Sequence, residues 1–163
     1  MNSWMVITSN EFKDWHNDFT DEQKANYELC MKYPIIIPHD NENFQYEYTM
    51  LDFIPAGWRV AFGEKFAADL QEALNKLTEA ERDEIWITEV KEKFCMLRVY
   101  LSNYTDELNE VLTKYEKLSA RTCIKCGEPA TKISQGYHLP WCDECAKDSY
   151  QCMIDIHEFL GVE

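Results

Sequence analysis

The stretch CIKCGEPATKISQGYHLPWCDEC, residues 123–145, decides the fold of the C-terminal part of the chain. It contains two Cys-x-x-Cys pairs, Cys123 with Cys126 and Cys142 with Cys145, separated by 15 residues. Four thiolates suit the tetrahedral coordination of zinc, and this spacing lies at the edge of the range for paired-cysteine zinc sites. The sequence therefore predicts that the four cysteines bind Zn²⁺. The alternatives are two reduced, metal-free pairs or a redox pair.

The residues around the two pairs predict the shape of a metal-binding module over residues 121–163. Gly127 permits the positive φ that often follows such a knuckle, and residues 131–138 are expected to form a hairpin. Apolar residues recur with a helical rhythm over 146–160, so the second pair is expected to stand at the start of a helix. This order resembles the treble-clef class of zinc finger, with a ribbon-like module as the alternative. Four ligands leave zinc no open position, so the predicted role is structural.

Residues 1–120, upstream of the module, predict an α+β domain. Apolar residues recur every three or four positions from Trp58 to Leu77, which indicates a helix. Residues 84–101 predict two strands, with 91–93 as their exposed connection, and residues 105–119 predict a second amphipathic helix. We therefore expect a small hairpin sheet packed with helices, joined near Ala120 to the four-cysteine module.

Two weaker patterns lie nearer the N-terminus. Residues 20–23 (TDEQ) form a capping box, which predicts a helix that continues to about Met31 and that Pro34 prevents from extending. Residues 46–48 (YEY) alternate as a short strand would.

The charge of the chain is strongly negative. Its 163 residues include 16 Lys and Arg against 30 Asp and Glu, a net charge of −14, and each third of the chain is acidic. This balance disfavours duplex DNA as a partner. Acidity either keeps the protein soluble or provides a surface for a basic partner.

The sequence also predicts a cytoplasmic location. Its longest aliphatic run is Ile35–Ile37, and its first residues lack a basic, apolar leader, so no membrane span or secretory signal is expected. Seven cysteines, an odd number, favour a reducing compartment. The three cysteines outside the two pairs, Cys30, Cys95 and Cys152, are expected to be buried as small apolar side chains.

Catalytic motifs give little reason to expect an enzyme. The sequence has no glycine-rich phosphate loop and no H-E-x-x-H pair. Glu128 beside the cysteine pairs faintly echoes the signature of zinc deaminases, but a fourth thiolate would close the position that their catalytic water needs. The chain is therefore interpreted as non-enzymatic.

Residues 57–63 (GWRVAFG) and 90–100 (VKEKFCMLRVY) resemble motifs of a family of small phage and prophage proteins. That family has G-W-R-x-A-F-G and I-K-E-K-[FY]-G-x-L-R-x-Y segments and often a C-terminal C-x-x-C-G knuckle, and the resemblance covers about residues 33–146. Cys95 replaces the family's glycine, which disfavours a tight backbone turn there. The basic residues of these motifs are candidates for a small anion or partner site: Arg59, Lys91, Lys93 and Arg98. The resemblance implies a phage origin and the cytoplasm of the host cell.

Three interpretations of function follow. The first is a non-enzymatic, acidic, zinc-stabilised protein of phage type that inhibits or sequesters a host protein with a basic surface, for example by mimicking nucleic acid. Its candidate interface is acidic and aromatic and comprises Trp15, Asp18, Asp21, Glu22 and Tyr27. The second is a zinc-finger adaptor that contacts nucleic acid or the transcription machinery. The third is a small-nucleotide-binding protein or enzyme that uses Arg59 and Arg98. The oligomeric state stays open.

Overall fold

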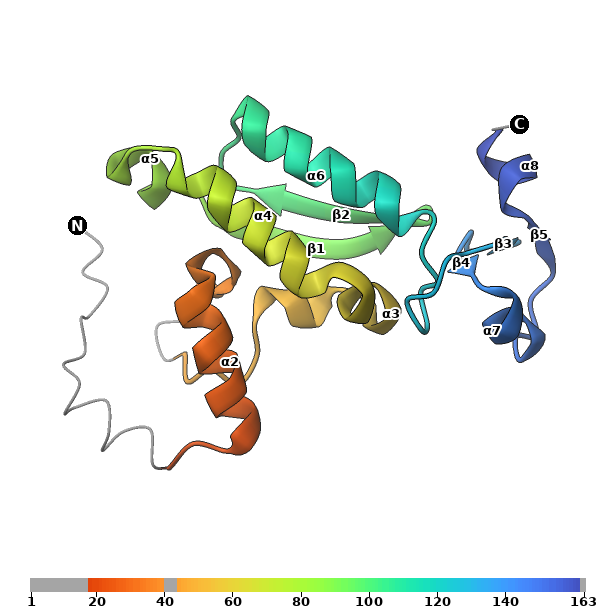
Figure 1. Cartoon of the computed structure of the whole chain (residues 1–163), viewed down its shortest axis with the longest axis horizontal. Helices are drawn as coiled ribbons and strands as arrows, with labels where there is room; N and C mark the ends of the chain where they lie inside the picture. Colours follow the sequence, from red (N-terminus) through yellow and green to blue (C-terminus); the bar gives the residue numbers. More distant parts are fainter. Residues whose placement is uncertain (1–17, 40–43, 162–163) are drawn as a thin grey trace.

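The computed structural model describes residues 18–39 and 44–161, and it has the expected mixture of helices and small antiparallel sheets. Figure 1 shows the helices α4 (Glu64–Asn75) and α6 (Asp106–Ser119) lying along the hairpin of β1 (Ile87–Lys93) and β2 (Met96–Leu101). The helix α2 (Asp21–Lys32) meets the start of α4 at its own C-terminal end, where Lys32 pairs with Glu64. The C-terminal elements β3 to α8 lie at the far end of this hairpin. The predicted α+β class and the position of the cysteine-rich module are therefore confirmed. The division near Ala120 stays a prediction.

The first described helix, α2 (Asp21–Lys32), begins at the predicted capping box. The Thr20 hydroxyl accepts a hydrogen bond from the Gln23 backbone N–H at 3.2 Å, and the Gln23 side chain accepts one from the Thr20 N–H at 2.9 Å. The helix ends before Pro34, where a short 3₁₀ helix, η2 (Pro34–Ile36), begins. The boundaries agree with the prediction because both signals are local.

The predicted strand at residues 46–48 is wrong. Tyr46 has a φ of 58°, which breaks an extended backbone, and no strand includes it. Its ring instead packs against the rings of Tyr27 and Phe44, at centroid distances of 4.9 and 4.8 Å. A second 3₁₀ helix, η3 (Met50–Phe53), follows. Aromatic packing, rather than strand pairing, fixes this segment.

The predicted helix over 58–77 is present in three consecutive parts: α3 (Ala56–Trp58), the π-helical turn η4 (Arg59–Gly63) and α4 (Glu64–Asn75). The predicted apolar stripe is buried as far as Leu74, with Trp58 and Phe66 fully so, whereas Leu77 is half-buried. The helix α5 (Glu79–Asp83) comes next, capped by Thr78. The π turn is a departure that the apolar periodicity did not indicate.

The hairpin of β1 (Ile87–Lys93) and β2 (Met96–Leu101) turns later than expected. Lys93 pairs with Met96, so residues 91–93 belong to the strand rather than to a connection. Phe94 and Cys95 alone form the loop, at φ of 50° and 62°. A two-residue loop with both residues left-handed suits the twist of a hairpin. The expectation that Cys95 disfavours a tight turn is therefore wrong.

Replacing Phe94 with asparagine is expected to stabilise the protein. Phe94 is 64% exposed and adopts a left-handed conformation that asparagine accepts at lower cost. We expect the free energy of unfolding to rise by about 1 kcal/mol, which raises Tm by about 2–4 °C in a chain of this length. Thermal unfolding followed by circular dichroism measures the shift. Tyr137→Asn, at another exposed aromatic residue without a positive φ, is the control and should not show this gain.

The main core lies between α4, the hairpin and α6 (Asp106–Ser119). The buried Tyr115 of α6 packs edge-on against Phe66, with ring centroids 5.2 Å apart. Its hydroxyl donates a hydrogen bond to the Asp69 carboxylate at 2.7 Å. This contact fixes the position of α6 on α4. The first cysteine pair follows directly after the end of α6, so its position is fixed as well.

The C-terminal module contains a three-stranded sheet in the order β4-β3-β5. The strands β3 (Lys132–Ser134) and β4 (Pro140–Trp141) form the predicted hairpin, and the helix α7 (Asp143–Lys147) follows. The continuous helical rhythm expected over 146–160 is wrong in its middle part. There β5 (Met153–Asp155) pairs with β3, and only α8 (Ile156–Leu160) resumes a helix.

Cys152, just before β5, is exposed, so its predicted burial is wrong, whereas Cys30 and Cys95 are buried as expected. No helix within residues 18–39 and 44–161 is both long and apolar enough to cross a membrane.

Candidate metal centre

The four predicted ligands come from two elements of the C-terminal module. Cys123 and Cys126 lie in a tight turn after α6, in which the Gly127 N–H donates to the Cys123 carbonyl at 3.0 Å. Gly127 has a φ of 86°, as the knuckle was predicted to require. Cys142 is the N-cap residue of α7, and Cys145 lies in the first turn of that helix. The second pair therefore stands at a helix start, as expected.

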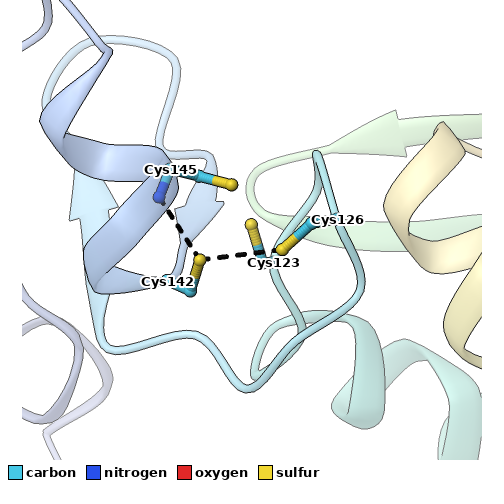
Figure 2. Close-up of side chains that lie close together, drawn as sticks. All are labelled: Cys123, Cys126, Cys142 and Cys145. Atoms are coloured by element: carbon cyan, nitrogen blue, oxygen red, sulfur yellow. Dashed lines mark hydrogen bonds between the residues drawn. The ribbon is translucent and has the colours of Figure 1, made fainter.

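The four sulfur atoms face one another (Figure 2) and all lie within 4.8 Å of each other. The Cys126 and Cys142 Sγ atoms are 3.6 Å apart. A tetrahedral zinc ion with bonds of about 2.3 Å places its sulfurs about 3.8 Å apart, so small side-chain movements suffice. The residues present therefore fit a four-thiolate metal site, and the predicted ligand set forms one cluster.

The backbone around Cys123 favours a thiolate. Burial alone would raise the pKa of the Cys123 thiol, but hydrogen bonds from the backbone N–H groups of Cys142, Cys126 and Lys125 lower its pKa to about 7. Burial and the neighbouring sulfurs raise the pKa of Cys145 to about 12. A cluster without a cation thus holds few thiolates, because each negative sulfur opposes the next. A divalent cation removes this opposition.

The first knuckle is bonded directly to the start of α3. The Gly57 N–H donates to the Ile124 carbonyl at 2.9 Å, and the Trp58 indole N–H donates to the Thr122 carbonyl at 2.8 Å. A Cβ at Gly57 would lie against the Cys123 carbonyl oxygen and 2.7 Å from the Ile124 carbonyl. Only glycine allows this approach.

From the sequence, Gly57 was identified only as the first residue of the GWRVAFG motif. Its role as a contact for the knuckle was missed, because a contact between segments this far apart leaves no local signal.

A second, smaller core joins the module to the hairpin. Its buried members are Cys95 from the β1–β2 turn, Ala120 after α6, and Ile133 and Ile156 from the module. Cys95 is 1% exposed, and burial raises the pKa of its thiol, so it acts as a small apolar side chain. The metal site is therefore attached to the α+β part by hydrogen bonds on one side and by apolar packing on another.

The four basic residues of the candidate anion site are mostly paired with acids. Arg59 pairs with Asp52, Lys91 with Glu89 at 2.7 Å, and Arg98 with Glu116 at 2.5 Å. The Lys93 ammonium lies 5.6 Å from the centre of the Phe94 ring. Lys91 and Arg98 are cross-strand neighbours, whereas Arg59 lies on the π-helical turn. Their role in binding an anion stays a prediction.

The candidate acidic and aromatic interface is only partly within the described residues. Asp18, Asp21 and Glu22 are exposed around the start of α2, while Tyr27 is half-buried against Tyr46. Trp15 lies outside the described residues. The carboxylates are thus accessible, but Tyr27 also stabilises the fold.

Comparison of the chain with models of known protein families, with curated proteins and with solved structures finds no match in any of the three.

Proposed function

We propose that this chain is a non-enzymatic binding protein whose four-cysteine site holds a structural Zn²⁺ ion. The observation that carries the proposal is the cluster of four sulfurs within 4.8 Å, contributed by a knuckle and a helix start. An all-cysteine donor set suits zinc, and four thiolates complete its tetrahedral shell. The ion then has no open position for a water or a substrate, so it stabilises the module rather than activating a reactant.

The partner that we propose is a host protein with a basic surface, bound through the start of α2. Asp21 and Glu22 are exposed in the first turn of that helix, and Asp18 lies exposed before it. The net charge of −14 would speed encounter with a basic surface and repel nucleic acid. The resemblance of residues 57–63 and 90–100 to phage proteins supports a phage origin, and with it a role in inhibiting or sequestering a factor of the bacterial host.

Neutralising the two acids of α2 is expected to abolish this binding. The experiment captures proteins from a nuclease-treated bacterial lysate on the tagged chain. The double variant Asp21→Asn with Glu22→Gln should retain at least about tenfold less of the basic partner protein than the unmodified chain, because two charge pairs with the partner are lost. Retained protein is measured by quantitative mass spectrometry.

The matched control is Asp106→Asn with Glu107→Gln. These residues are exposed acids in the first turn of α6, so both double variants lose the same charge and the same helix-dipole stabilisation. Equal retention by the two double variants would place the binding surface elsewhere, and no retention by the unmodified chain would overturn the proposed partner.

A further inference from the structure

A cavity of about 280 Å³ lies on the α+β part, away from the metal ligands. Its walls come from η2, from the C-terminal half of α4 and from the segment that joins α5 to β1. The apolar part of the lining includes Ile35, Leu74 and Ile85, all nearly fully buried. Small-molecule sites of proteins typically measure about 300–1,000 Å³, so this cavity suits a compact ligand rather than a dinucleotide.

Two of the residues that line the cavity carry aromatic rings. His39 and Trp86 both line the cavity, and their rings stack on each other with centroids 3.9 Å apart and planes 13° apart. Aromatic rings in such walls favour planar apolar groups, which stack against them or meet them edge to face. The shape of the lining thus favours a planar apolar body.

The polar part of the lining has an arginine without an ion pair among the described residues. Arg82 lines the cavity from the last turn of α5, and its guanidinium has no ion pair or hydrogen bond with any residue in 18–39 or 44–161. In the same protein Arg59 and Arg98 each pair with an acid, and the chain has 30 acids against 16 bases. An unpaired guanidinium beside a partly apolar cavity is suited to bind a carboxylate or similar anion by two hydrogen bonds.

Two neighbouring groups refine the chemistry of the ligand. The Gln71 side chain accepts a hydrogen bond from the Ile35 N–H at 2.9 Å and donates one to the side-chain Oδ1 of Asn75 at 3.0 Å. This bond leaves the Asn75 amide N–H groups as further donors at the cavity. Asp83 also lines the cavity, and its carboxylate disfavours any negative group that is not paired with Arg82.

We propose that this cavity binds a small molecule with a planar apolar body and a single anionic group, which pairs with Arg82. The site goes beyond the proposed binding of a protein partner, because it shares no residue with the start of α2 or with the cysteine cluster. The protein would thus bind a small-molecule ligand in addition to its protein partner.

The experiment uses the zinc-loaded full chain with naphthoate as the probe and its uncharged amide, naphthamide, as the matched comparison. Binding is measured by isothermal titration calorimetry and by saturation transfer from protein to ligand in NMR. We expect naphthoate to bind, and naphthamide to bind at least about tenfold more weakly because the charge-assisted pair with Arg82 is lost.

Three variants test the position of the site. Arg82→Gln should weaken naphthoate binding about tenfold and leave naphthamide unchanged, whereas Arg82→Lys should restore part of the affinity. Asn75→Trp, at an exposed lining residue, should block both probes. Arg121→Gln, at an exposed arginine outside the cavity, is the control and should change neither. Far-ultraviolet circular dichroism confirms that each variant is folded.

Absence of any naphthoate binding at millimolar concentration would overturn the proposal. Equal affinities of the unmodified chain and Arg82→Gln for naphthoate would overturn it as well, since the anion would then be bound elsewhere.

Discussion

Replacing Cys123 with serine is expected to abolish zinc binding and to unfold the C-terminal module. Cys123 is fully buried, and hydrogen bonds from backbone N–H groups lower the pKa of its thiol to about 7, which favours the thiolate that binds a metal ion. A serine hydroxyl does not replace it, because zinc in such sites requires a deprotonated donor. Four buried residues form the core beside the module, which is too little apolar burial to hold its strands and short helices without the ion.

Elemental analysis and near-ultraviolet circular dichroism measure this effect. The unmodified chain should hold one zinc ion, and the Cys123→Ser chain should hold none and lose the near-ultraviolet signal of the module. Cys152→Ser, which removes an exposed cysteine outside the cluster, is the matched control and should keep both. Full zinc content together with an unchanged spectrum in Cys123→Ser would contradict a structural four-cysteine site.

Replacing Gly57 with alanine is expected to be nearly as disruptive, although Gly57 lies far from the cysteines in sequence. The new Cβ would overlap the Cys123 carbonyl oxygen and approach the Ile124 carbonyl to 2.7 Å. These are backbone atoms of the knuckle and have no flexible end that can swing away. We expect the free energy of unfolding to fall by about 3 kcal/mol, at the upper end of the cost of overpacking. The knuckle should also bind its metal more weakly.

Gly63→Ala provides the control for this substitution. Gly63 closes the π-helical turn six residues later, and a Cβ there would meet only the Arg59 side chain, at 3.2 Å. Both substitutions gain the helix propensity of alanine, so the difference between them isolates the clash with the knuckle. Urea unfolding measures the free energy of unfolding of each variant. The rate of zinc release to a chelator measures how tightly the four-cysteine site holds its metal. Equal stability of the two variants would show that the knuckle yields to the added methyl group.

The sequence was sufficient for the features that depend on neighbouring residues. The Cys-x-x-Cys spacing predicted all four members of the sulfur cluster, because a knuckle is built from consecutive residues. The capping box at Thr20 predicted the first residue of α2 for the same reason. The apolar stripe that begins at Trp58 predicted the buried face of α4.

Features that depend on distant residues were missed or wrong. The β1–β2 turn was placed too early, because Cys95 is held in its left-handed conformation by burial in a core that the module supplies. The strand β5 was taken for helix, since its apolar residues fit a helical period and only pairing with β3 makes them extended. The contact of Gly57 and Trp58 with the knuckle gave no periodic signal at all.

The Cys95 side chain at the tip of the hairpin has a consequence for how the protein can be divided. Because that side chain fills the small core shared with Ile133 and Ile156, a protease cut near Ala120 leaves each fragment with an uncovered apolar surface. Neither fragment then keeps the full set of contacts that it has in the intact chain. The four-cysteine module is thus not an independent unit, because part of the core that covers it belongs to the hairpin.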